Sequence, residues 1–176
     1  MTIEHILIFA HIIGTIIGVG SATMLESHLG KALKDKLVSE DERAILGVDY
    51  RAMRVGLVII ILSGFGFLLL DKFEGKTMYL YSPYLWAKLT FVMVILANTL
   101  LLQAKSINLY WGSTFSFVSW WSAALVGMFV THRLRFDFFG DGQFITVFAS
   151  LMSLYVVAVI VGAIALNFFR NKSLSS

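Results

Sequence analysis

Long runs of apolar residues alternate with shorter polar segments along the whole chain. Five runs rich in Ile, Leu, Val and Phe lie at about 5–25, 52–71, 84–104, 114–132 and 144–169. A helix of about 20 residues, at a rise of roughly 1.5 Å per residue, crosses the roughly 30 Å hydrocarbon core of a bilayer. The pattern therefore predicts an all-α fold, a polytopic transmembrane helical bundle of five spans that forms one domain over residues 1–176.

The longest polar segment, 26–51, mixes acidic with basic residues. Within it, Ser39 and Glu42 have the spacing of a capping box, in which each side chain bonds the other residue's backbone N–H. A helix is therefore expected to begin near Ser39 and to run through Arg54 into the second span. The segment as a whole is predicted to be a charged cytoplasmic loop with helical extensions of the neighbouring spans.

Composition supports a membrane protein and excludes several other classes. Hydrophobic residues make up 58% of the chain, more than is usual for a soluble domain. The chain has no cysteine, which excludes disulfides and thiolate metal sites. The net charge of +3 is small and the basic residues lie mainly in the polar segments, so the expected partner is the lipid bilayer and not nucleic acid.

The basic residues also predict an orientation, because Lys and Arg stay preferentially on the cytoplasmic side of a membrane. Nine of them fall on one side of the five-span topology: Lys31, Lys34, Lys36, Arg43, Arg51, Arg54, Lys105, Arg170 and Lys172. Four fall on the other side: Lys72, Lys76, Arg133 and Arg135. The N-terminus is therefore predicted outside, and the C-terminus inside, a bacterial inner membrane.

The first span carries an ionisable residue, His11, which is a functional hypothesis by default because an unpartnered polar ring is costly in lipid. His11, Gly14 and Gly18 share one helix face at i, i+3 and i+7. Two interpretations stay open: a packing face with a hydrogen-bonded histidine, or a flat cofactor that lies on the glycines and is held by His11. Gly14-x-x-x-Gly18 also allows close contact of two membrane helices, either within one chain or in a homodimer.

Three further residues are expected near the depth of His11, in the outer half of the bundle. Lys88 lies about 6 Å inside the third span, and His11 about 8 Å inside the first. The fourth span ends beside His132, one turn beyond Met128. Two imidazoles from different helices can ligate haem iron in a bundle, so we predict a b-type haem with His11 and His132 as iron ligands. Lys88 would neutralise a propionate, and Met128 would line the cofactor pocket.

Two of these residues also have simpler interpretations, which stay open. Lys88 can extend its ammonium to the lipid headgroups while its stem remains in the apolar region. His132, beside Arg133 at the end of its helix, can act as an exposed cap.

Several segments resemble a bacterial family of uncharacterised integral membrane proteins, over most of the chain. The likeness rests on the histidine followed by a Gly-rich run (AHIIGTIIGVGSATMLES), on Trp86-x-Lys88 at the start of a span that contains Asn98, and on the SWW motif at 119–121. That family implies a membrane bundle and brings no established activity.

A more distant likeness is to the HemJ-type protoporphyrinogen oxidases and the copper-resistance D proteins, which are small helical membrane bundles. In the HemJ type, a histidine in the first span is important for haem b binding, and an important lysine in the third span lies in a W-L-x-x-K-L setting. His11 matches the first position, and Lys88, in YLWAKL at 84–89, matches the second. This chain differs from the HemJ type at Gly18 and at Glu26-Ser27. The resemblance implies haem b and, as an activity, oxidation of a porphyrinogen.

These observations leave three functions open. The leading hypothesis is a b-type haem-binding membrane protein with a redox or electron-transfer role, which exchanges electrons with a redox partner or a quinone. The alternative is a cofactor-free partner subunit or small transporter, in which His11, Lys88, Asn98 and Gln103 line a path. The third is a porphyrinogen oxidase, so a membrane oxidoreductase activity stays open and no residue is assigned as catalytic.

Overall fold

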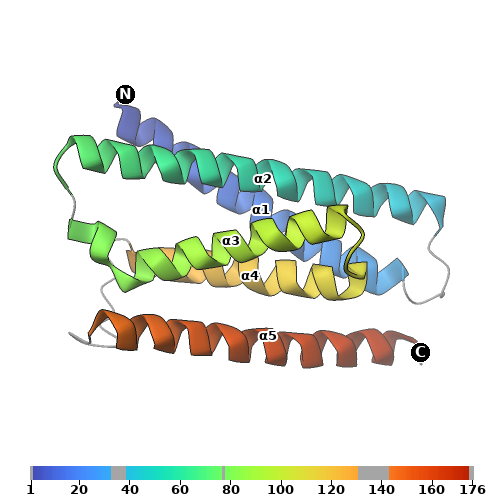
Figure 1. The fold of residues 1–176 in the computed structure, drawn as a ribbon. Helices are drawn as coiled ribbons and strands as arrows, with labels where there is room; N and C mark the ends of the chain where they lie inside the picture. Colours follow the sequence, from blue (N-terminus) through green and yellow to red (C-terminus); the bar gives the residue numbers. More distant parts are fainter. Residues whose placement is uncertain (1, 33–38, 77, 131–142, 175–176) are drawn as a thin grey trace.

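The computed structural model describes residues 2–32, 39–76, 78–130 and 143–174, and the regular secondary structure in these ranges is helical. The elements are α1 (Ile3–Ala32), α2 (Glu40–Phe73), the short 3₁₀ helix η1 (Met78–Tyr81), α3 (Pro83–Gln103), α4 (Leu109–Val130) and α5 (Phe144–Leu174). Figure 1 shows an elongated bundle in which consecutive α-helices run in opposite directions. The predicted all-α class is confirmed.

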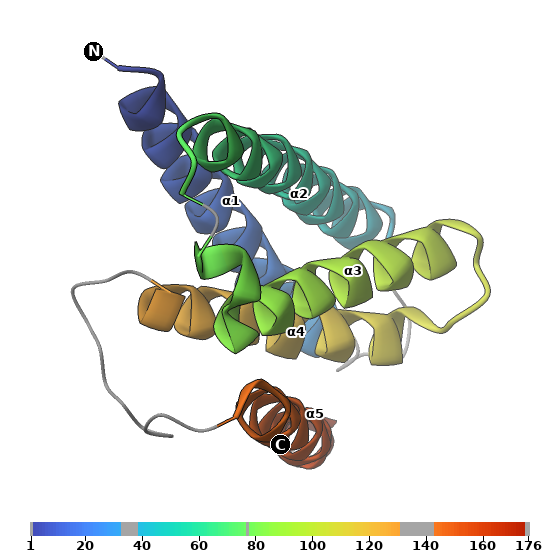
Figure 2. The same cartoon turned by 60° about the vertical axis from the view of Figure 1, so that its left-hand side comes forward.

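The helices are arranged in successive layers: in Figure 2, α1 and α2 lie on one side, α3 and α4 in the middle and α5 on the other side. α1 and α2 pack against each other and make the most extensive helix contact among the described residues. α4 packs against α1, α3 and α5, whereas α2 has little contact with α3. Because α5 lies on the far side of α3 and α4 from α2, α4 is the central helix of the bundle.

Within the described ranges, α1, α2, α3 and α5 are long and apolar enough to cross a membrane. α4, which corresponds to the fourth predicted span, is not among them. It carries a set of fully or almost fully buried hydroxyl side chains: Ser113, Thr114, Ser116 and Ser119. Since α4 is packed against three other helices, these polar groups face protein, where hydrogen-bond partners are at hand. The general prediction of a helical protein suited to a membrane is confirmed.

A local sequence signal sets the start of α2. Ser39 is its N-cap: the Ser39 hydroxyl accepts from the Glu42 N–H, and the Glu42 carboxylate accepts from the Ser39 N–H at 2.9 Å. The predicted capping box is therefore confirmed. α2 then continues to Phe73. The expected loop 26–51 consists mainly of helical extensions of α1 and α2. The exceptions are the cap residue Ser39 and residues 33–38, which lie outside the described part.

A seam of glycines holds α1 against α2. A Cβ atom built on Gly56 would lie 2.7 Å from the backbone nitrogen of Gly18 and 2.9 Å from the carbonyl oxygen of Gly14. A side chain does not fit at these distances, so the two backbones approach closely because all three residues are glycine. In this structure Gly14-x-x-x-Gly18 therefore serves a contact within one chain.

Hydrogen bonds between helices connect α2, α3 and α4. The Asn98 side chain on α3 donates to the Gly112 carbonyl and to the Ser116 hydroxyl on α4, both at 2.8 Å. The Tyr50 hydroxyl on α2 donates to the Thr99 carbonyl on α3 at 2.7 Å. In a surrounding without water such bonds satisfy polar groups, and they help to decide which helices are neighbours.

Candidate functional site

His11 lies on α1, and its ring is held by a serine of α2. The His11 Nδ1 atom is 2.9 Å from the Ser63 Oγ atom, and the Ser63 hydroxyl donates to the Ile59 carbonyl at 2.7 Å. A hydroxyl has one hydrogen, so Ser63 accepts a hydrogen bond from the Nδ1–H of His11. In the neutral ring the other nitrogen, Nε2, then carries no hydrogen and is an acceptor.

Lys88 of α3 bonds that acceptor. Its Nζ atom is 2.9 Å from His11 Nε2, so the lysine donates to the imidazole. His11, Lys88 and Ser63 form a continuous polar set across α1, α2 and α3, which we call the His–Lys–Ser cluster. His11 and Lys88 are both half-buried. The sequence predicted them at a similar depth, and the structure brings their side chains into direct contact.

Small and aromatic residues surround the cluster. A Cβ atom on Gly127 of α4 would lie 3.4 Å from the Lys88 Nζ atom, and a Cβ atom on Gly64 of α2 would lie 3.9 Å from the His11 ring. Phe67 of α2 packs edge-on against the His11 ring, with ring centroids 5.9 Å apart. α4 therefore closes the site beside Lys88, and four helices contribute to it.

The contact between His11 and Lys88 limits the charge that the cluster can hold. Two unit positive charges 2.9 Å apart repel by about 6 kcal/mol at an effective dielectric constant of about 20. His11 is therefore neutral when Lys88 is an ammonium, and a proton that joins His11 must leave Lys88 uncharged. The pair therefore holds at most one excess proton, shared between an imidazole and an amine.

Gly14 and Gly18, which were expected beneath a cofactor under one interpretation, are covered by protein. Gly14 faces α2, and the indole ring of Trp120 on α4 rests directly on Gly18. Trp120 is 1% exposed, whereas its neighbour Trp121 is 42% exposed. In this structure the glycine face carries helix packing beside a hydrogen-bonded histidine, and Trp120 fills the place next to Gly18.

The remaining predicted ligands fall in parts that the structure does not describe. His132 lies outside the described residues, and of Met128 only the backbone, in α4, is described. Among the side chains that are described, no group of three or more His, Asp or Glu residues is placed to hold a metal ion. His28, near the opposite end of α1 from His11, pairs with Asp49 of α2 at 2.6 Å.

Ser63 was not among the residues expected at the site. It is the one hydroxyl residue in the apolar run 52–71. A single polar residue in a membrane span usually forms a hydrogen bond with another helix. The sequence could therefore have indicated Ser63 as a site residue. That the partner is His11 depends on how α1 and α2 cross, which the sequence pattern does not show.

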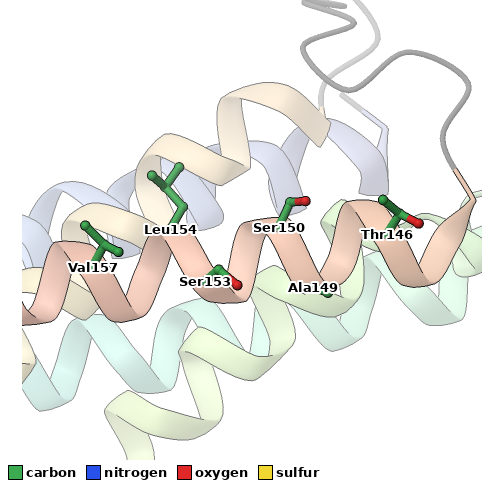
Figure 3. Close-up of a pocket in the computed structure, with 6 residues that line it drawn as sticks. All are labelled: Thr146, Ala149, Ser150, Ser153, Leu154 and Val157. Carbon is green, nitrogen blue, oxygen red and sulfur yellow. The ribbon is translucent and has the colours of Figure 1, made fainter.

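A shallow groove on α5 is separate from the cluster (Figure 3). Its lining belongs to α5 alone: Thr146, Ala149, Ser150, Ser153, Leu154 and Val157. The lining offers hydroxyl groups and apolar side chains but no titratable group, and Leu154 is 62% exposed. In a bilayer such a surface would meet acyl chains, so the groove is not the candidate site.

Comparisons of the chain with protein-family models, with curated proteins and with solved structures found no match. The fold and the site therefore define the protein by class: an all-α protein with membrane-compatible helices and a His–Lys–Ser cluster that joins three of them. The resemblance to the HemJ-type and copper-resistance D proteins stays a prediction.

Proposed function

We propose that the chain is a five-span protein of a bacterial inner membrane, with its N-terminus outside, that binds and releases a proton at the His11–Lys88 pair. On this proposal it belongs to the cofactor-free class, as a small proton-coupled transporter or a proton-conducting subunit. The observation that carries the proposal is the 2.9 Å contact between Lys88 Nζ and His11 Nε2 among apolar helices.

An imidazole and an amine in contact form a proton-exchange site. When Lys88 is an ammonium, one of its N–H bonds is directed at the Nε2 lone pair of His11. Transfer of that proton leaves a neutral amine and an imidazolium with both nitrogens protonated. Ser63 accepts from Nδ1–H in both states, so the ring need not turn during the transfer. One proton moves along one hydrogen bond and the total charge stays the same.

The position of Lys88 supports a role beyond packing. Ionisable side chains in membrane spans are costly and commonly lie where ions or protons move. Snorkelling to the headgroups would direct the ammonium to the membrane surface. Here the ammonium bonds His11 of another helix, which snorkelling alone does not require.

Proton flux into sealed proteoliposomes tests the proposal. The purified protein is reconstituted in vesicles loaded with the pH indicator pyranine, and a potassium gradient with valinomycin drives proton entry. We expect wild-type flux above that of empty vesicles, and a loss of at least about tenfold in Lys88→Met because the exchangeable group is gone. Lys105→Met, at an exposed position just after α3, is the matched control and should keep wild-type flux. Wild-type protein without flux, or full flux in Lys88→Met, would overturn the proposal.

A b-type haem on His11 is the second candidate function. Ser63 favours it, since a histidine that ligates a metal almost always donates its other ring N–H to a second group. As packed, however, the described residues do not fit a haem. Lys88 bonds the Nε2 atom that would ligate the iron, and Trp120 covers Gly18. This candidate therefore requires that Lys88 first leave His11.

Absorption spectra of detergent-purified protein, oxidised and then reduced with dithionite, decide between the two candidates. A Soret band that is lost in His11→Ala would favour haem and a redox role with a redox partner or a quinone. A flat visible spectrum after expression with ample haem would favour the proton site. Consumption of a porphyrinogen by the purified protein would support the oxidase that the resemblance implies.

A further inference from the structure

α2 lies at the edge of the bundle and carries an exposed apolar face (Figure 2). Large apolar side chains that are exposed by half or more recur on it every three or four residues: Val55, Val58, Leu62, Phe65 and Leu69. This spacing keeps them on one side of the helix. In a membrane the face would meet the acyl chains of lipids.

Two arginines continue this apolar face toward the start of α2. Arg51 is four residues before Val55, and Arg54 is four residues before Val58, so the side chains of each pair are neighbours on the helix surface. Arg51 is exposed and Arg54 is half-buried. No hydrogen bond or ion pair joins either arginine to the rest of the described chain. The described residues thus leave two positive charges unneutralised at one end of the apolar face.

Tyr50 holds the guanidinium of Arg54. The guanidinium carbon lies over the Tyr50 ring, 5.5 Å from its centroid, and the Tyr50 hydroxyl is anchored to the Thr99 carbonyl of α3 at 2.7 Å. Because Tyr50 precedes Arg54 by one turn, this contact directs the arginine toward the polar end of α2. An arginine held by an aromatic ring can still donate several N–H bonds to a phosphate. Arg54 is therefore preorganised to bind an anion.

The surface of α2 beside the two arginines is open at Gly47. Gly47 lies one turn before Arg51 and two turns before Arg54, and a Cβ atom built on it would meet nothing within 4 Å among the described residues. Long side chains of a helix extend over the turn that precedes their own Cα atom. A small anionic group above Gly47 would therefore lie within reach of both guanidinium groups.

The carboxylates on this part of α2 are engaged elsewhere or distant. Asp49 pairs with a histidine of α1 at 2.6 Å, and Glu42 takes part in the capping box. Glu40 and Asp41 lie about 15 Å or more from Arg51 along the helix axis. That separation exceeds the Debye length of about 8 Å at physiological ionic strength, so these charges are largely screened. The two arginines are thus free to attract a negative charge from outside the chain.

We infer that this face of α2 binds an anionic phospholipid. The phosphate contacts Arg51 and Arg54 above Gly47, and one acyl chain follows the apolar face from Val58 to Phe65. The rise from Arg54 to Phe65 is about 16 Å, half of the roughly 30 Å hydrocarbon core, which matches the depth of one leaflet. A zwitterionic lipid would bring its own cation beside the arginines, and a free phosphate has no acyl chain for the apolar face. This site does not depend on the proposed proton function.

Native mass spectrometry of the detergent-purified protein tests the site, in titrations with phosphatidylglycerol and with phosphatidylcholine of the same acyl chains. We expect the wild type to bind phosphatidylglycerol at least about tenfold more tightly. The double variant Arg51→Gln, Arg54→Gln should lose this preference while its circular dichroism is unchanged. Lys31→Gln with Lys105→Gln is the matched control, because both lysines are exposed near the same end of the bundle and their replacement removes the same charge. The control should keep the preference.

Equal affinity of the wild type for the two lipids overturns the site, and this comparison needs no variant, so it stands even if a variant fails to fold. A preference that persists in the arginine variant, or that is lost equally in the lysine control, also overturns it, because the net charge would then act without a defined place. Inorganic phosphate at millimolar concentration should not displace the lipid; displacement would make the occupant a soluble phosphate. A dimer free of lipid in the same spectra would show that a second copy covers the face instead.

Discussion

Replacing Gly56 with alanine tests whether backbone contact holds α1 against α2. The added Cβ would lie 2.7 Å from the Gly18 nitrogen and 2.9 Å from the Gly14 carbonyl oxygen, whereas ordinary contacts begin at 3.4 Å. Both neighbours are backbone atoms, so no rotamer change can relieve the overlap. The shortfall, about 0.7 Å against the nearer atom, must be met by moving the two helices apart.

Two opposing effects set the size of the change in stability. Alanine favours a helix over glycine by up to about 1 kcal/mol. Forcing an extra carbon into a packed interface costs about 1–3 kcal/mol, and separation by about 0.5–1 Å forfeits roughly a quarter to a half of each dispersion contact along it. Since the helix propensity offsets part of this cost, we expect Gly56→Ala to lower the free energy of unfolding by up to about 2 kcal/mol, and to lie about 1–3 kcal/mol below a glycine-to-alanine change without overlap.

Gly47→Ala is the matched control, because Gly47 lies on the same helix and a Cβ there would meet nothing within 4 Å. This variant should gain up to about 1 kcal/mol of stability from helix propensity alone. Unfolding by a denaturing detergent in mixed micelles, followed by circular dichroism and tryptophan fluorescence, measures both variants. If Gly56→Ala unfolds at the same detergent fraction as Gly47→Ala, the close backbone contact between α1 and α2 is refuted.

Three further predictions concern hydrogen bonds and an ion pair. Asn98→Ala removes two bonds to α4 and should lower the free energy of unfolding by about 1–2 kcal/mol, measured in the same detergent titration; an unchanged midpoint would contradict it. Tyr50→Phe removes one bond to the Thr99 carbonyl and should cost only about 0.5–1 kcal/mol, so a loss larger than that of Asn98→Ala would reverse the expected order. The Glu74 carboxylate, which bonds Lys76 at 2.6 Å, raises the pKa of that ammonium through the hydrogen bond and its charge. Glu74→Gln should lower the Lys76 pKa, so the ammonium loses its proton at lower pH; NMR titration of the Lys76 side chain would show no difference if the pairing is wrong.

Local sequence was enough to predict the helical class and part of the register. Apolar runs of about 20 residues predict membrane-compatible helices because their length and composition match the bilayer core. The capping box of Ser39 and Glu42 marks the start of α2, since it depends on residues three positions apart. The similar depth of His11 and Lys88 follows from the constant rise of a helix. Each of these properties depends on one helix at a time.

Contacts between helices, in contrast, were decided by the tertiary structure. Ser63 reaches His11, and Trp120 reaches Gly18, because of the angle and register at which α1, α2 and α4 cross. The crossing angle and the register depend on side chains that are far apart in the sequence and interlock only when the helices pack. The hydrophobic period of a single helix does not encode them. The glycine face shows the difference: the helical period predicts that Gly14 and Gly18 share a face, but packing decides that α2 and Trp120 cover it.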